Sequence, residues 1–124
     1  MTEILFKEES FKIIGIYMEI HRELGMGFKE VNYKEALEIE LKEKVIPFHR
    51  EKRFKVCYKG KVLAHPYIAD FVVYNSIVLE IKSATSIIDS FVAQTISYLK
   101  ASEMHLGIIV NFGEKSLKWQ CIVF

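Results

Sequence analysis

Cysteine and proline are scarce in this sequence, with two of each among 124 residues, and glycine occurs only six times. Neither cysteine belongs to a CxxC pair or a Cys/His cluster, which excludes a disulfide scaffold and a structural zinc site. Cys57 and Cys121 each lie in an apolar, strand-like stretch, so we expect two buried, reduced thiols. The scarcity of proline and glycine also argues against a long disordered tail.

Long apolar runs are missing as well, since none approaches the ~20 residues of a membrane-spanning helix. The N-terminus, MTEILFKEES, carries acidic residues and lacks the apolar core of a secretory signal. These features predict a cytoplasmic protein with no membrane partner. Hydrophobic residues nevertheless make up 51% of the sequence, so we expect residues 1–124 to form a single domain with its own core.

Charge is almost balanced over the whole chain but unevenly distributed. Residues 1–43 carry 6 Lys and Arg against 10 Asp and Glu, whereas residues 44–124 carry 11 against 6. Alternating positions of a strand at residues 50–61 can form a basic ribbon that binds phosphates. The alternative is a solvated edge strand protected by its charges. The basic side chains concerned are Arg50, Lys52, Arg53, Lys55, Lys59 and Lys61.

Hydrophobic periodicity predicts the element order α-α-β-β-β-α-β-β. Two helices are expected at residues 10–24 and 29–43, the first with Phe11 and Met18 on its apolar face. Strands are expected at residues 48–60, 61–74, 77–82, 105–113 and 116–124, with a third helix at 86–102. This order is typical of an α/β or α+β fold in which one mixed sheet packs against helices.

Three charges, Asp70, Glu80 and Lys82, interrupt the apolar hairpin ADFVVYNSIVLEIK. A two-residue turn would pair Asp70 with Ile81 and put the two carboxylates on opposite faces, whereas an odd-length loop or a bulge pairs Asp70 with Glu80. The second register gathers apolar side chains on one face more completely than the first. One face then carries Ala69, Phe71, Val73, Ile77, Leu79 and Ile81, and the other Asp70, Val72, Tyr74, Val78, Glu80 and Lys82. We therefore predict the second register, with the three charges on one face.

Two carboxylates opposite each other repel unless a cation lies between them. Lys82 can supply part of that charge, and Mg²⁺ or Mn²⁺ can supply more, because these ions prefer oxygen ligands. A lysine beside such an ion can orient or deprotonate a water. Asp70, Glu80 and Lys82 therefore have the groups that phosphodiester hydrolysis requires. From spacing alone, the alternative is a surface ion pair on a half-exposed sheet face.

A larger pattern surrounds these residues. Gly27-x-x-Glu30-x-x-Tyr33 resembles the signature of the GxxExxY proteins, a group within the PD-(D/E)XK nuclease-like superfamily. The similarity continues through VCYKGKVLAHPYIADFVV, LEIKS, QTISYLKAS and LGIIVNFG. It implies a restriction-endonuclease-like αβββαβ core, with a mixed sheet flanked by helices and an extra N-terminal helix. Ala69 replaces the Pro of the superfamily motif, as is common in the group.

The resemblance also implies roles for the charged residues. Asp70 corresponds to the first metal carboxylate, and Glu80 and Lys82 to the (D/E)xK pair. The backbone carbonyl of Ile81 would be a further ligand of Mg²⁺ or Mn²⁺. Glu30 resembles an upstream catalytic glutamate and is a possible second metal ligand.

Further residues are assigned to the site by the same resemblance. Gln94 and Tyr98, four apart on one helix face, match a QxxxY element that supports the site. Tyr33 is placed with them, although residues of these types are also common packing and capping groups. The implied function is a Mg²⁺-dependent nuclease acting on DNA rather than RNA, as a possible homodimer. The alternative is an inactive nuclease-fold module that binds nucleic acid or another protein.

Overall fold

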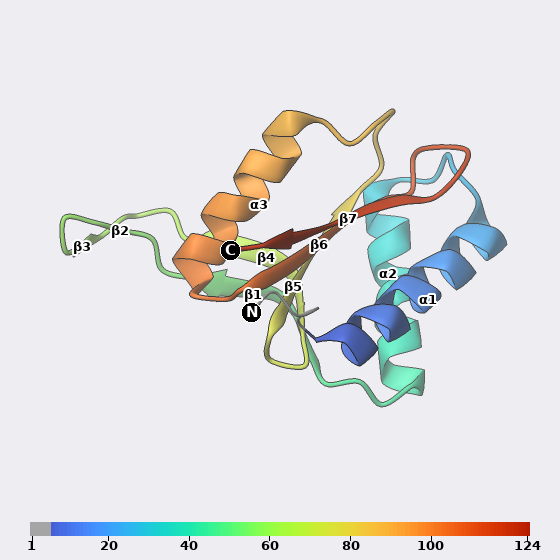
Figure 1. Ribbon diagram of the computed structural model, residues 1–124, viewed down its shortest axis with the longest axis horizontal. Helices are drawn as coiled ribbons and strands as arrows, with labels where there is room; N and C mark the ends of the chain where they lie inside the picture. The colour runs from blue at the N-terminus through green and yellow to red at the C-terminus, as the bar shows by residue number, and fades with distance from the viewer. Residues whose placement is uncertain (1–5) are drawn as a thin grey trace.

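The computed structural model describes residues 6–124 as a five-stranded sheet with helices on both faces (Figure 1). The elements are α1 (Lys7–Leu24), α2 (Glu30–Glu43), β1 (Phe48–Phe54), β2 (Cys57–Tyr58), β3 (Lys61–Val62), β4 (Tyr67–Val73), β5 (Ile77–Lys82), α3 (Asp89–Ser102), β6 (Leu106–Asn111) and β7 (Lys118–Val123). The strand order is β1-β4-β5-β6-β7, and among these described strands β5 and β6 are parallel while the other neighbours are antiparallel. The predicted mixed sheet is confirmed.

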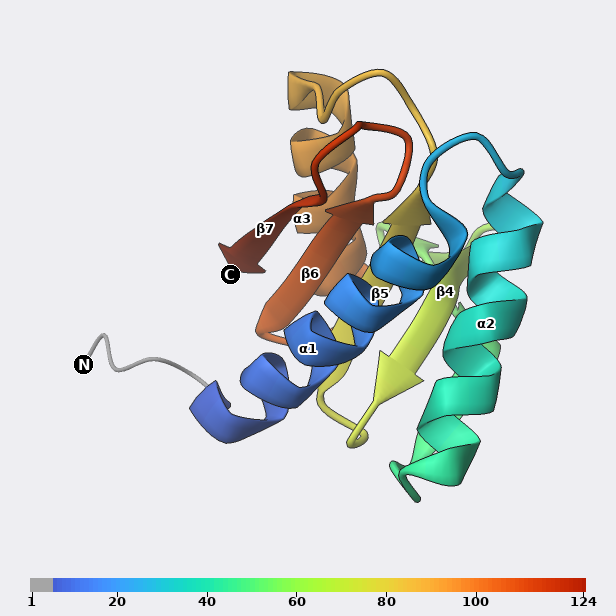
Figure 2. The same ribbon diagram turned by 90° about the vertical axis from the view of Figure 1, so that its right-hand side faces the viewer.

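The sheet separates two hydrophobic cores. Helices α1 and α2 cover one face and α3, the crossover between the parallel strands β5 and β6, covers the other (Figure 2). The larger core includes Ile13, Tyr17, Leu37, Phe71, Leu79 and Ile108, and the smaller core includes Tyr67, Ala69, Val72, Val78, Leu99 and Ile109. The middle strands are therefore covered on both faces.

The helices begin and end close to their predicted positions, but α1 is rotated from the prediction. Phe11 is 64% exposed and Met18 is also exposed, whereas Ile13 and Tyr17 are buried against the sheet. Helix α1 carries apolar residues on more than one side, and the sheet covers only one of them. Within the described part of the chain, no helix combines the length and apolar character that crossing a membrane requires.

The strands differ more from the prediction. The expected strand 48–60 ends at Phe54, and the expected strand 61–74 begins its sheet pairing only at Tyr67, directly after Pro66. Between them, β2 and β3 form a separate hairpin that projects from the sheet (Figure 1). The prediction of one strand over residues 48–60 is therefore wrong, and the basic residues of 50–61 do not follow one continuous strand.

Both thiols are free, but the prediction that they are buried is wrong. Cys57 lies on the projecting β2–β3 hairpin and Cys121 lies on β7, at the edge of the sheet, and both are exposed. The apolar neighbours that suggested burial belong to strands with one open side.

Candidate functional site

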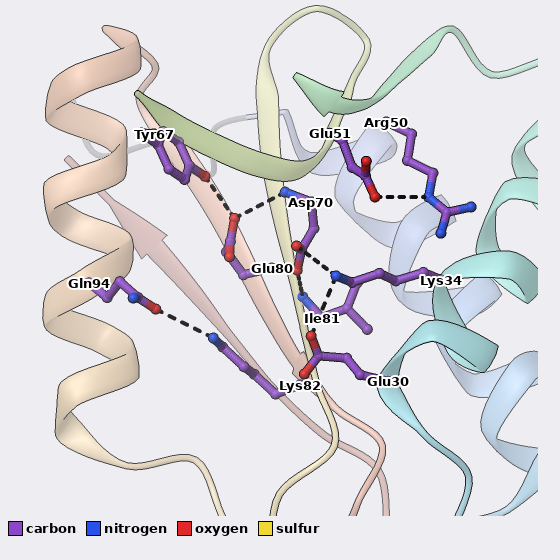
Figure 3. A network of polar contacts seen from close by, with 10 residues as sticks. All are labelled: Glu30, Lys34, Arg50, Glu51, Tyr67, Asp70, Glu80, Ile81, Lys82 and Gln94. Carbon is purple, nitrogen blue, oxygen red and sulfur yellow. Dashed lines mark hydrogen bonds and ion pairs between the residues drawn. The ribbon is translucent and has the colours of Figure 1, made fainter. Parts of the chain in front are cut away.

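The site lies where β4 and β5 separate. These strands are joined by a three-residue turn and pair regularly as far as Phe71 with Leu79. One step further brings Asp70 opposite Glu80, so the predicted register is confirmed. The ladder ends there, and Oδ2 of Asp70 accepts a hydrogen bond from the backbone N–H of Ile81 at 2.8 Å (Figure 3). The two strands thus open into a fork that carries both carboxylates.

The predicted division of side chains between the two faces fails at both ends of the hairpin. Ala69 packs in the core under α3 rather than with Phe71, because the regular pairing of β4 is interrupted at Asp70. Tyr74 packs against the α1–α2 core, since it belongs to the turn and has a φ of 56°. The carboxylate of Asp70 contacts Lys34 of α2, whereas Glu80 contacts Tyr67 on the α3 side. The three charges therefore meet at the fork rather than on one face.

Glu80 is the buried carboxylate of the site, with an exposed fraction of 4%. Its Oε2 accepts a hydrogen bond from the hydroxyl of Tyr67 at 2.7 Å and a long one from the backbone N–H of Asp70 at 3.5 Å. Burial and, after it, the negative charge of Asp70 raise the pKa of Glu80 to about 7. The hydrogen bonds and Lys82 lower that pKa but do not cancel the rise. The two carboxylates are thus close enough to repel each other.

Lys82 extends from the end of β5 toward α3. Its ammonium donates a hydrogen bond to Oε1 of Gln94 at 3.4 Å (Figure 3). The same ammonium lies 4.7 Å from the centre of the Phe91 ring. The predicted association of Gln94 with the site is therefore seen as a direct contact. Lys82 lies beside the two carboxylates. Among the described residues, it forms an ion pair with neither of them.

The first turn of α2 approaches the fork from the other side. The ammonium of Lys34 lies 3.0 Å from Oδ1 of Asp70 and 3.4 Å from Oε1 of Glu30. Burial alone would lower the pKa of Lys34, but its hydrogen bonds to Asp70 and Glu30, and their charges, raise it. Glu30 is thus brought to the edge of the site, where Lys34 lies between it and Asp70 (Figure 3).

Tyr33 does not reach the carboxylates. It is fully buried, its ring stacks on Phe112 at a centroid distance of 4.4 Å, and its hydroxyl donates to the carbonyl of Gly25. Gly27 has a φ of 112°, a conformation that disfavours any side chain. In the Gly-x-x-Glu-x-x-Tyr pattern, the glycine and the tyrosine therefore fix the corner before α2, and this corner presents Glu30 to the site.

Tyr98 supports Glu80 through a second aromatic residue. Its ring stacks on Tyr67 with a centroid distance of 3.6 Å, and Tyr67 in turn donates to Glu80. Burial, and then the charge of Glu80, raises the pKa of Tyr98. Gln94 and Tyr98 occupy one face of α3, as predicted, and contact two different parts of the site.

The basic residues of 50–61 are spread over several surfaces. Arg50 forms an ion pair with Glu38 of α2 at 3.0 Å and lies over the Phe71 ring. Lys52 lies over Phe54, while Arg53 and Lys55 are exposed near the end of β1. Lys59 and Lys61 belong to the projecting hairpin, which turns at Lys59-Gly60 as predicted. Among the described residues, Arg50 is the one basic side chain of this set that forms an ion pair with a residue of another element.

The donor set suits a sparsely coordinated divalent ion. Within residues 6–124, no three His, Cys, Asp or Glu side chains converge as a metal-holding group. Mg²⁺ is commonly bound by one or two carboxylates and keeps several waters. The mutual repulsion of Asp70 and Glu80, visible in the raised pKa of Glu80, is the electrostatic condition that a cation relieves. The chemistry of the residues at the fork therefore fits such an ion, for which two carboxylates, those of Asp70 and Glu80, are available.

Sequence reasoning missed two residues of this site, Lys34 and Tyr67. A signal for Lys34 was present, because Glu30 and Lys34 are four residues apart on a helix and can form an ion pair. No comparable signal marks Tyr67. Its contact with Glu80 joins two strands near the point where their ladder ends, and it could not be inferred from spacing.

Comparison with known proteins agrees with this architecture. A family model described as the PD-(D/E)XK nuclease superfamily matches residues 7–122. The crystal structure of SSO0001 is similar to this chain with a TM-score of 0.60 and 22% sequence identity, covering 95% of this chain and 57% of that protein. At this identity the likeness concerns the fold, and the chain spans little more than half of that protein's length. None of the curated proteins compared with the chain matches it. The predicted restriction-endonuclease-like fold is confirmed, and the chain belongs to the PD-(D/E)XK nuclease superfamily.

Proposed function

We propose that this protein is a metal-dependent nuclease that hydrolyses phosphodiester bonds, with DNA preferred over RNA. The observation that carries the proposal is the fork between β4 and β5, where Asp70 lies opposite Glu80 with Lys82 beside them. Two repelling carboxylates in a largely buried position are costly to the fold, and such groups gather where chemistry uses them.

Asp70 and Glu80 are the proposed ligands of Mg²⁺ or Mn²⁺, with the backbone carbonyl of Ile81 as a third. When bound, the ion supplies positive charge against the charge that develops on the phosphate. Lys82 orients the attacking water, and its contact with Gln94 keeps it extended toward α3. Tyr67, stacked on Tyr98, holds the carboxylate of Glu80 in a single orientation.

The remaining features of the proposal concern the substrate and the assembly. Exposed basic residues near the end of β1 and on the β2–β3 hairpin are proposed to bind the phosphate backbone. A domain of this size covers only a short piece of duplex, so a homodimer is proposed. The corner formed by Gly27, Glu30 and Tyr33 supports membership in the GxxExxY group.

Divalent-ion-dependent cleavage tests the proposal. We expect wild type to cleave at least one of linear, supercoiled or single-stranded DNA and RNA in Mg²⁺ or Mn²⁺. Glu80→Gln and Lys82→Met should each lose at least ~100-fold in rate, since each removes one of the proposed catalytic groups. Glu35→Gln and Lys118→Met are matched controls at exposed positions away from the fork and should retain activity. Equal trace activity in wild type and Glu80→Gln would identify a contaminant and refute the proposal.

One observation favours a second candidate, a non-catalytic module that binds nucleic acid. The ammonium of Lys34 already neutralises Asp70 and Glu30, as expected of a site that has exchanged metal binding for an internal ion pair. Such a protein would bind DNA or RNA in a gel-shift experiment with equal affinity in the presence of EDTA or Mg²⁺. It would cleave neither, and Glu80→Gln would leave binding unchanged.

A further inference from the structure

The ammonium of Lys34 lies between the two carboxylates that a second metal ion beside Asp70 would have to share. It lies 3.0 Å from Asp70 and 3.4 Å from Glu30, and only 17% of its side chain is exposed. A Mg²⁺ ion shared by these two carboxylates would have to lie ~2.1 Å from an oxygen of each. The two volumes overlap, because the ammonium already lies between the same two oxygens.

The charges at the fork lead to the same result. Three carboxylates, from Glu30, Asp70 and Glu80, face two ammonium groups, from Lys34 and Lys82 (Figure 3). This leaves one uncompensated negative charge, which a first divalent ion more than balances. A second divalent ion would have to enter an already positive region beside Lys34, which is unfavourable in a partly buried site.

The position of Glu30 agrees with this arrangement. It is the nearest further carboxylate on α2, yet it does not converge with Asp70 and Glu80 into a group of three within the described residues. Its Oε1 contacts Lys34, one helical turn away, instead. The residue that would be needed to complete a second ion site is thus already engaged by the lysine.

We propose that Lys34 replaces the second metal ion, so that this protein binds one divalent ion, at Asp70 and Glu80, beside a fixed ammonium. The inference rests on the proposed function, because it takes Asp70 and Glu80 as ligands. Lys34 is a positioning residue in this scheme: it orients Asp70 and excludes a second ion. Glu30 is then the partner of Lys34 and not a metal ligand.

Calorimetric titration of the full chain with Mn²⁺, without nucleic acid, tests this. We expect one ion per chain for wild type and two for Lys34→Met, which keeps the apolar stem and removes the charge. Adding Glu30→Gln to Lys34→Met should return the count to one. Lys34→Arg should keep the count at one, because the charge is retained. Lys34→Gln replaces the Met variant if circular dichroism shows that the latter is unfolded.

Lys42→Met is the matched control, since Lys42 also pairs with a glutamate four residues away on α2 but lies far along the helix from the fork. It should bind one ion. Two ions in wild type, or one in both Lys34→Met and Lys34→Gln, overturn the inference and leave the proposed function standing. No ion in wild type overturns the proposed metal site and this inference together.

Discussion

The two halves of the β4–β5 hairpin are built in opposite ways. Next to the turn the ladder is complete, and Val73, Ile77 and Leu79 are fully buried between the helices and the sheet. Next to the fork the ladder has ended, and the strands meet through the side chains of Asp70 and Glu80. The same two strands thus stabilise the fold at one end and, at the other, hold the buried carboxylate of Glu80, whose raised pKa means that its charged form destabilises the fold.

Within a few residues, the hairpin therefore contains one half that stabilises the fold and another half that carries the proposed catalytic groups. In the closed half a side chain matters through the apolar contacts it makes, and in the open half through the charge it carries. Substitutions in the two halves should therefore differ in sign as well as in size, which can be measured as free energies of unfolding.

The largest effect is expected in the closed half. Leu79→Ala should lower the free energy of unfolding by about 2–5 kcal/mol, because it leaves a cavity where the side chain is fully buried. Urea denaturation measures this change. Ile68→Ala, on the exposed side of β4, is the control and should cost no more than about 0.5 kcal/mol. Equal losses at the two positions would contradict the described packing.

A smaller effect of opposite sign is expected in the open half. The pKa of Glu80 is about 7 in the folded protein and near 4.5 when unfolded, so the folded state binds more protons between these values. Stability therefore falls as the pH rises through this window. Glu80→Gln, which stays uncharged, should be up to about 3 kcal/mol more stable than wild type at pH 8, because each unit of the pKa difference corresponds to about 1.4 kcal/mol.

Thermal or urea denaturation at several pH values checks this change. The advantage of Glu80→Gln should vanish near pH 4, where Glu80 is protonated in both states. Glu35→Gln, at an exposed position on α2, is the control. If Glu80→Gln were destabilised at every pH, the carboxylate of Glu80 would be a stabilising group, and the contrast between the two halves would fail.

The smallest effect concerns the hydroxyl that holds Glu80. Because the hydrogen bond from Tyr67 lowers the pKa of Glu80, Tyr67→Phe should raise that pKa. Mn²⁺ binding requires the deprotonated carboxylate, so its midpoint should move to higher pH than in wild type. The variant should also lose about 1 kcal/mol of stability.

Calorimetry across pH 6–8 measures the midpoint of Mn²⁺ binding, and Tyr98→Phe serves as the control. Coincident profiles for wild type and Tyr67→Phe would show that the hydroxyl does not act on Glu80.

The register of the hairpin could be predicted from the sequence because its hydrophobic pattern distinguishes the two alternatives. Pairing Asp70 with Glu80 gathers Phe71 and Leu79 on one face, and pairing Asp70 with Ile81 does not. The faces of α1 could not be predicted in the same way. That helix has apolar residues on several sides, and only the position of the sheet decides that Ile13 is buried and Phe11 is exposed.

The polar contacts of the site also differ in whether the sequence could reveal them. Glu30 and Gln94 were found because helical spacing and a known pattern bring them near the fork. Tyr67 was missed because its contact with Glu80 depends on where the β4–β5 ladder ends. The exposure of Cys57 and Cys121 was missed because sequence does not reveal which strands lie at edges.

The turn between β4 and β5 also sets a rule for protein engineering. Its three residues fix which side chain of one strand stands across from which side chain of the other. A grafted loop of another length leaves Asp70 opposite Glu80 as long as Val73 still pairs with Ile77. A loop that makes Val73 pair with a neighbour of Ile77 moves the carboxylates apart, even though no site residue has been altered. A replacement loop at this position therefore has to be chosen for a turn geometry that keeps the pairing of Val73 with Ile77.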